Sequence, residues 1–296
     1  MRCRRHGATR ADVVMLVILV LGVVWLFLFM LLPAYQRKRW HDNRLLCGRN
    51  LAGIGKAIAV YANDYDGGLP ITGGPGTAWG PGLRDWKAHS RAEAFGLDPN
   101  GIGGAATVSA SLYLLVKYAG MSPESFVCRW DKGAAMFRPG KYGVGTEKLS
   151  AFWDFGPDPA RHCSYAYHLP YGPYRVTTSS EGNMVVAADR NPWIDGPREK
   201  AREFSLFQPD LLSSNGTTEQ ALQGNARSHN CDGQNVLYLD GHVQFAKRAF
   251  CGLEDDNVYT SWDGRDRVRG VPPKPYESQP AHEHDSLLVN DPPLER

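Results

Sequence analysis

The most apolar stretch of the chain is Val13 to Leu32, in which 20 consecutive residues carry no charge. At about 1.5 Å of rise per residue, a helix of this length spans roughly 30 Å, which matches the hydrocarbon core of a bilayer. The apolar region of a signal peptide is shorter, about 7–15 residues, and ends at a small-residue cleavage site. No Ala-x-Ala site follows here. We therefore expect a retained transmembrane helix over 13–32, with a cleaved signal peptide as the alternative.

Apolar residues continue with helical spacing beyond this run. Spacings of three and four residues indicate a single buried face of a helix, and the residues that make it are Cys47, Leu51, Ile54, Ile58, Tyr61 and Tyr65. A Gly-Gly pair at 67–68 ends the pattern. The sequence predicts one long helix from Val13 to about Tyr65, whose second part, 33–66, offers this face to a folded domain.

The second half of the chain has the patterns of β-strands. Asp240-Gly241 lies between two alternating apolar runs, and such a pair predicts a two-residue hairpin loop of type I′, with positive φ at both positions. A short amphipathic helix is predicted over Val108–Gly120. The predicted strands are 164–169, 183–188, 235–239 and 242–246.

These patterns predict an α+β fold in which a long N-terminal helix packs on a mostly antiparallel sheet. The 32 glycines and 20 prolines among 296 residues indicate many loops, the longest over 72–104. The expected organisation is a basic leader-like segment at 1–12, a transmembrane helix at 13–32, its continuation at 33–66, an extracytoplasmic domain at 67–270 and a disordered tail, rich in proline and charge, at 271–296.

Charge and cysteine usage limit the partners and the kinds of site. The formal net charge of +2 does not favour nucleic acid as a partner, and basic residues flank both ends of the apolar run, so they assign no orientation. No Cys-x-x-Cys occurs, which argues against zinc ribbons and redox motifs. One or two disulfides are expected in an oxidising compartment, with their pairing left open, and the candidates are Cys128, Cys163, Cys231 and Cys251.

Three stretches of the chain carry a resemblance to a known family. The first is a basic leader that ends at Gly7, followed by Ala8 and then a carboxylate at Asp12. The second, at 47–70, reads CGRNLAGIGKAIAVYANDYDGGLP. The third comprises AADRNP at 187–192, GQNVLYLDGHVQF at 233–245 and FCGLEDDNVYT at 250–260. With these stretches the chain resembles bacterial prepilin-like proteins, including the pseudopilin-like proteins of type II secretion, and more narrowly a group with a C-terminal His-x(9)-Asp-Gly motif.

The resemblance implies a pilin-like fold, cleavage after Gly7, methylation of the new N-terminus at Ala8, and contact of Asp12 with the terminal amine of a neighbouring subunit. It also implies like subunits, or secretion and pilus assembly proteins, as partners. The chain departs from the pattern in two ways: Ala8 and Arg10 stand where larger or apolar residues are usual, and ten residues rather than nine separate His229 from Asp-Gly. A one-residue insertion or bulge is expected there, near Cys231.

Four residues are candidate metal ligands, namely Asp189, His229, Asp240 and His242. Asp189 and Asp240 each end an apolar strand, so adjacent strands could bring the two carboxylates together. Two carboxylates with loop carbonyls suit Ca²⁺, whereas the histidines favour Zn²⁺, and the resemblance implies calcium because related pseudopilins have calcium-stabilised loops. The alternative is that these residues build turns, and we expect this non-catalytic role.

The sequence therefore predicts a non-catalytic, membrane-anchored, pilin- or pseudopilin-like structural protein of a secretion or surface-fibre system. Its expected location is the bacterial inner membrane, in contact with lipid, with the C-terminal domain outside the cytoplasm. One alternative is a membrane-anchored module that binds an envelope ligand through exposed aromatic residues. The other is a metal-dependent envelope enzyme, which requires the four candidate ligands to converge in an open cleft.

Overall fold

The computed structural model of the chain describes residues 10–145, 148–211 and 217–294. The candidate processing residues Gly7 and Ala8 lie outside the described residues. The chain divides into two units, residues 1–43 and 44–296. Helix α1, Arg10–Asp64, has 55 residues and contributes to both units.

The first unit contains an apolar helical segment. This segment, Arg10–Leu32, has a mean hydropathy of 3.2, and the part of the chain that the structure describes has no other helix long and apolar enough to cross a membrane. Its large apolar side chains from Val13 to Leu32 are all exposed in the structure. Asp12 stands in the first turn of α1. Length and composition thus fit a membrane span, and a signal sequence shares both properties.

The second unit is built on a five-stranded sheet whose order is β6-β5-β4-β3-β7. All neighbouring strands are antiparallel, which confirms the predicted α+β class and antiparallel sheet. The register places Tyr165 opposite Asp189. The strands are β3 (Tyr165–His168), β4 (Val185–Asp189), β5 (Gln234–Tyr238), β6 (Val243–Ala246) and β7 (Leu288–Val289).

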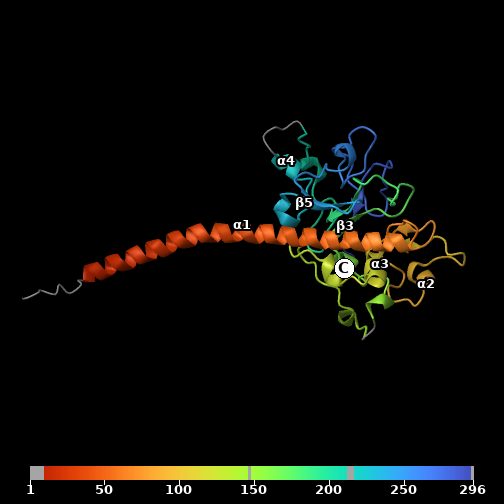
Figure 1. Cartoon of the computed structure of the whole chain (residues 1–296), viewed down its shortest axis with the longest axis horizontal. Coiled ribbons are helices and arrows are strands. Elements are labelled where there is room, and N and C mark those ends of the chain that lie inside the picture. The colour runs from red at the N-terminus through yellow and green to blue at the C-terminus, as the bar shows by residue number, and fades with distance from the viewer. Residues whose placement is uncertain (1–9, 146–147, 212–216, 295–296) are drawn as a thin grey trace, which may run out of the picture. The chain divides into compact units, whose positions relative to one another are not determined.

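The C-terminal part of α1 is the centre of the domain core. It packs in one hydrophobic cluster with helix α3 (Val108–Ala119) and with inward residues of β3, β4 and β5, and Figure 1 shows it between α3 and the labelled strands. The predicted face is buried at Cys47, Leu51, Ile54, Ile58 and Tyr61, whereas Tyr65 is 44% exposed. The predicted helical periodicity is therefore confirmed up to the last turn.

Shorter elements complete the domain, and several lie where the sequence predicts a long loop. They are β1 (Ala78–Trp79) paired in parallel with β2 (Ala105–Ala106), α2 (Arg91–Phe95) and α4 (Glu219–Leu222). The 3₁₀ turns are Pro123–Phe126, Pro139–Tyr142, Leu149–Ala151, Pro159–Arg161, Phe204–Leu206, Ser228–Cys231 and Leu253–Asp255.

The C-terminal segment differs from the prediction. Residues 271–294 are ordered, and β7 forms the edge of the sheet by pairing with β3. Leu287, Leu288 and Val289 are completely buried. The expected disordered tail at 271–296 is therefore wrong for the described residues, because this short apolar run supplies a strand that the surrounding prolines and charges conceal in the composition.

The hairpin between β5 and β6 forms where the sequence predicts it, but with a different turn. The Gly241 amide donates a hydrogen bond to the Tyr238 carbonyl at 2.9 Å, and the Tyr238 amide donates one to the His242 carbonyl at 3.0 Å. Gly241 has φ +89°, whereas Asp240 is not among the positive-φ residues. The predicted type I′ turn is thus wrong. The geometry fits a three-residue loop, in which a type I turn is followed by a left-handed glycine.

Candidate metal centre

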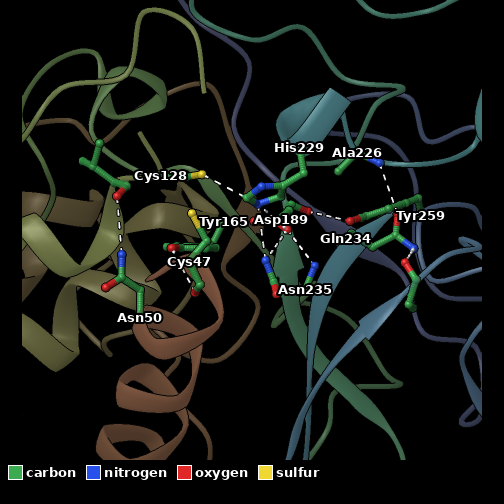
Figure 2. Close-up of polar contacts among 12 residues, drawn as sticks. Cys47, Asn50, Cys128, Tyr165, Asp189, Ala226, His229, Gln234, Asn235 and Tyr259 are labelled. Carbon is green, nitrogen blue, oxygen red and sulfur yellow. Dashed lines mark hydrogen bonds and ion pairs between the residues drawn. The ribbon is translucent and has the colours of Figure 1, made fainter. Parts of the chain in front are cut away.

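Four side chains that commonly bind metals meet inside the second unit. One donor atom from each lies within 4.8 Å of the other three, and the residues are Cys47, Cys128, Asp189 and His229. Their exposures are only 0%, 1%, 0% and 7%. Figure 2 shows the two thiols, the imidazole and the carboxylate pointing toward one another from separate parts of the chain. We call this group the Cys₂-His-Asp cluster.

The two cysteines approach the cluster from a helix and a loop. Cys47 lies on α1, and its carbonyl accepts a hydrogen bond from the Tyr165 hydroxyl at 3.4 Å. Cys128 follows the 3₁₀ turn Pro123–Phe126. The Asn50 side-chain amide of α1 donates to the Val127 carbonyl at 3.5 Å, which joins the helix to this loop. Both thiols are thereby held against the same end of the sheet.

Asp189 is the last residue of β4, and its side chain is held by Asn235. Oδ2 of Asp189 accepts hydrogen bonds from the Asn235 backbone amide at 2.7 Å and from its side-chain amide at 3.1 Å. The Tyr259 hydroxyl donates to the Asp189 carbonyl at 2.7 Å. Oδ1 is buried, and the described residues give it no hydrogen-bond partner. The carboxylate is therefore fixed in place with one oxygen lacking such a partner.

His229 lies in a strained turn. His229, Asn230 and Cys231 have φ values of 61°, 58° and 64°, and each non-glycine residue in this region costs on the order of 1 kcal/mol or more. The turn is stabilised by the Asn225 side-chain amide, which donates to the Cys231 carbonyl at 3.0 Å and to the Lys247 carbonyl at 2.8 Å. This turn presents His229 to the cluster.

The distances inside the cluster determine its electrostatics. Nε2 of His229 lies 3.4 Å from Asp189 Oδ2 and 3.9 Å from Cys128 Sγ. Burial lowers the pKa of His229, but the hydrogen bonds with Asp189 and Cys128 and the charge of Asp189 outweigh it and raise that pKa to about 10. The hydrogen bond with Cys47, together with burial, raises the pKa of the Cys128 thiol well above its ordinary value. Without a cation, an imidazolium therefore faces the carboxylate beside a neutral Cys128 thiol.

The structure does not bring the four predicted metal ligands together. Asp189 and His229 meet at the start of β5, whereas Asp240 and His242 lie beyond its other end, roughly five residues or 17 Å away along the strand. Nδ1 of His242 is 2.6 Å from Asp240 Oδ1, and both side chains are about half exposed. The predicted set is therefore two separate pairs, which do not converge in one cleft.

Sequence reasoning missed both thiols of the cluster as candidate metal ligands. The cysteines in the described residues are free thiols, so none of the disulfide candidates is paired in the structure. Cys163 and Cys251 donate to nearby carbonyls, and Cys231 accepts a hydrogen bond from Arg202. Cys47 occupies an apolar position of the α1 face, so its burial is explained by packing alone and its capacity to bind a metal is easily overlooked. The one signal in the sequence is that a cysteine lies on the face of the helix that must pack against the sheet.

Among the described residues, three tryptophans of the domain are buried and so form no exposed ligand-binding face. Trp79, Trp153 and Trp193 are at most 9% exposed, and Trp86 packs against Phe152 with ring centroids 5.2 Å apart.

Comparisons with protein-family models, with curated proteins and with solved structures find no match for this chain.

Proposed function

We propose that this chain is a membrane-anchored, pilin- or pseudopilin-like structural protein whose folded domain lies outside the cytoplasmic membrane. The observation that carries the proposal is that the two parts of α1 have different surroundings. Its first part is an exposed apolar segment of 23 residues, and its last part lies in the core of an antiparallel α+β domain. A single helix that serves both as anchor and as core element is the arrangement expected of such a subunit.

The interior of the domain supports a structural role over catalysis. The most strongly perturbed ionisable groups of the cluster are buried, whereas a catalytic acid or base must reach a substrate. The exposed pair at the hairpin, Asp240 and His242, is accounted for by the turn, since Asp240 also accepts a hydrogen bond from the His242 backbone amide at 3.0 Å. The buried tryptophans likewise favour a structural protein over a ligand-binding module.

The test is the intact mass of the protein extracted from its native membrane. A prepilin-like subunit is expected to begin at Ala8 with a methylated amine and to stay in the membrane after alkaline carbonate washing. A chain that keeps residues 1–7 would contradict the pilin-like part of the proposal. Release by carbonate, or a new N-terminus beyond Leu32, would contradict the membrane anchor.

A matched pair of variants makes this test specific. Gly7→Trp alters the residue before the predicted cleavage point and is expected to leave the leader attached. Thr9→Ser is the control and is expected to be processed like the natural chain. Equal processing of both variants would show that the leader is not read as a prepilin signal.

A further inference from the structure

We propose that the Cys₂-His-Asp cluster is a structural site for one divalent transition-metal ion of the zinc type. The ligands are Cys47, Cys128, Asp189 and His229. This inference is independent of the proposed membrane role, because it rests only on residues within the folded domain.

The donor set selects the class of metal. Two sulfurs, one imidazole nitrogen and one carboxylate oxygen make a mixed soft and borderline set, which zinc and similar ions accept. Calcium takes six to eight oxygen ligands and would not use the thiols. All four residues are at most 7% exposed, so the site has no open position for substrate. Closed four-ligand sites of this kind are structural rather than catalytic.

The spacing of the donors agrees with one ion at their centre. With metal–sulfur bonds of about 2.3 Å and metal–nitrogen or metal–oxygen bonds of about 2.0–2.1 Å, tetrahedral donors lie roughly 3.3–3.8 Å apart. The distance from His229 Nε2 to Asp189 Oδ2 is 3.4 Å, and that from the same nitrogen to Cys128 Sγ is 3.9 Å. No pair in the cluster exceeds 4.8 Å. An inward movement of about 1 Å or less therefore completes the tetrahedron.

An ion pair between Asp189 and His229 explains only half of the cluster. It does not explain why two thiols, 81 residues apart in the sequence, reach the same buried point. A buried carboxylate is stable only when paired or bound to a metal. A cation between the four donors would account for the meeting of both thiols with the carboxylate and the imidazole.

The outer contacts of the cluster resemble those that orient metal ligands elsewhere. Asn235 donates two hydrogen bonds to the Asp189 carboxylate, and partners of this kind fix the ligand and tune its affinity. Asn225, which lies outside the cluster, stabilises the strained turn at His229. The ion would thus join α1, the loop that carries Cys128, the end of β4 and the turn at His229. It would fasten the anchoring helix to the sheet.

The experiment uses the full-length protein, purified in detergent with a reducing agent and without chelators. Elemental analysis is expected to find one equivalent of zinc or a similar ion. After removal of the ion, titration with Co²⁺ is expected to give thiolate-to-cobalt charge-transfer bands and the visible bands of tetrahedral cobalt. Cys47→Ser/Cys128→Ser should lose the charge-transfer bands, whereas Cys163→Ser/Cys251→Ser, which changes two other free thiols, should keep them.

Three results would overturn the proposal. The first is a natural chain that gives no cobalt–thiolate band, a measurement that needs no variant to fold. The second is an equal band in both double variants. The third is a Cys47–Cys128 disulfide in protein alkylated in its native membrane. It would be seen as a mass lower by two hydrogens and as two cysteines that carry no alkyl label. Asp189→Asn keeps the size of the side chain, and it should weaken cobalt binding while leaving the circular dichroism spectrum unchanged.

Discussion

Gly55 of α1 packs directly on Leu237 of β5. A Cβ atom at position 55 would stand 2.7 Å from Leu237 Cδ1, closer than real carbon contacts allow. About two helical turns earlier on the same face, a Cβ atom at Gly48 would lie 3.1 Å from Asn235 Oδ1. The two glycines therefore let the helix backbone approach the strand that also supplies Asn235. This close approach sets the position of Cys47 relative to Asp189.

Substitution of Gly55 is expected to destabilise the domain despite the gain in helix propensity. Alanine is about 1 kcal/mol better than glycine inside a helix, but overpacking a core costs about 1–3 kcal/mol. Gly55→Ala should thus lower the free energy of unfolding by roughly 1 kcal/mol. Gly53→Ala is the matched control, because its Cβ would meet only Met121 Cε at 3.9 Å, and it should stabilise the protein. Urea denaturation compares the two, and equal effects would contradict the close packing.

The ordered C-terminal segment leads to a prediction at Asp291. Its carboxylate accepts hydrogen bonds from Trp79 Nε1 at 2.8 Å and from the backbone amides of Val108 and Ser109 at 3.0 and 2.8 Å. Asp291→Ala removes this cap from α3 and leaves buried donors unpaired, at a cost of about 2–4 kcal/mol. Glu277→Ala, exposed in the same segment, should change stability by less than about 0.5 kcal/mol. Thermal unfolding followed by circular dichroism measures both, and a small effect at Asp291 would argue for a loose tail.

His168 on β3 is expected to make stability depend on pH. Burial lowers the pKa of His168 to about 4, below the value of 6.5 expected in the unfolded chain. The unfolded state therefore binds the proton first as the pH falls, and stability is lost from about pH 6.5 downward to about pH 4. Between about pH 7 and about pH 5 this group should cost roughly 2 kcal/mol.

His168→Gln removes the titration and isolates this contribution. The natural chain and the variant are compared by urea denaturation at both pH values, and the difference between them should shrink or reverse in favour of the variant at the lower pH. A difference that stays constant between the two pH values would mean that burial does not shift the pKa of His168 in solution.

The sequence predicts much of the fold because periodic apolar patterns report burial directly. The helical face from Cys47 to Tyr61 and the hairpin at Asp240-Gly241 both occur where the patterns place them. The segment at 287–289 was missed, since a three-residue apolar run among prolines and charges has no periodicity to detect. The turn type at Gly241 depends on hydrogen bonding at the strand ends, which dipeptide preference alone does not determine.

The candidate site shows the opposite balance. Asp189 and His229 are selected from the sequence, yet their partners are not Asp240 and His242. Neighbouring strands of an antiparallel sheet run in opposite directions, so residues at the carboxyl ends of two such strands lie at opposite ends of the sheet. Cys47 and Cys128 join the cluster through the docking of α1 on the sheet, a tertiary contact between segments far apart in the chain.

Asn235 provides the last prediction, because it touches the cluster without being a ligand. Asn235→Ala removes the side-chain hydrogen bond to Asp189 and leaves the four donors in place. The hydrogen bond from the backbone amide of residue 235 remains. Loss of such an outer contact typically weakens metal binding about 10–100-fold, and cobalt titration measures this. Asp240→Asn/His242→Gln is the control, because these residues lie at the other end of β5 and should leave the affinity unchanged. If the control variant loses cobalt and Asn235→Ala keeps it, the metal belongs to the hairpin pair and not to the buried thiols.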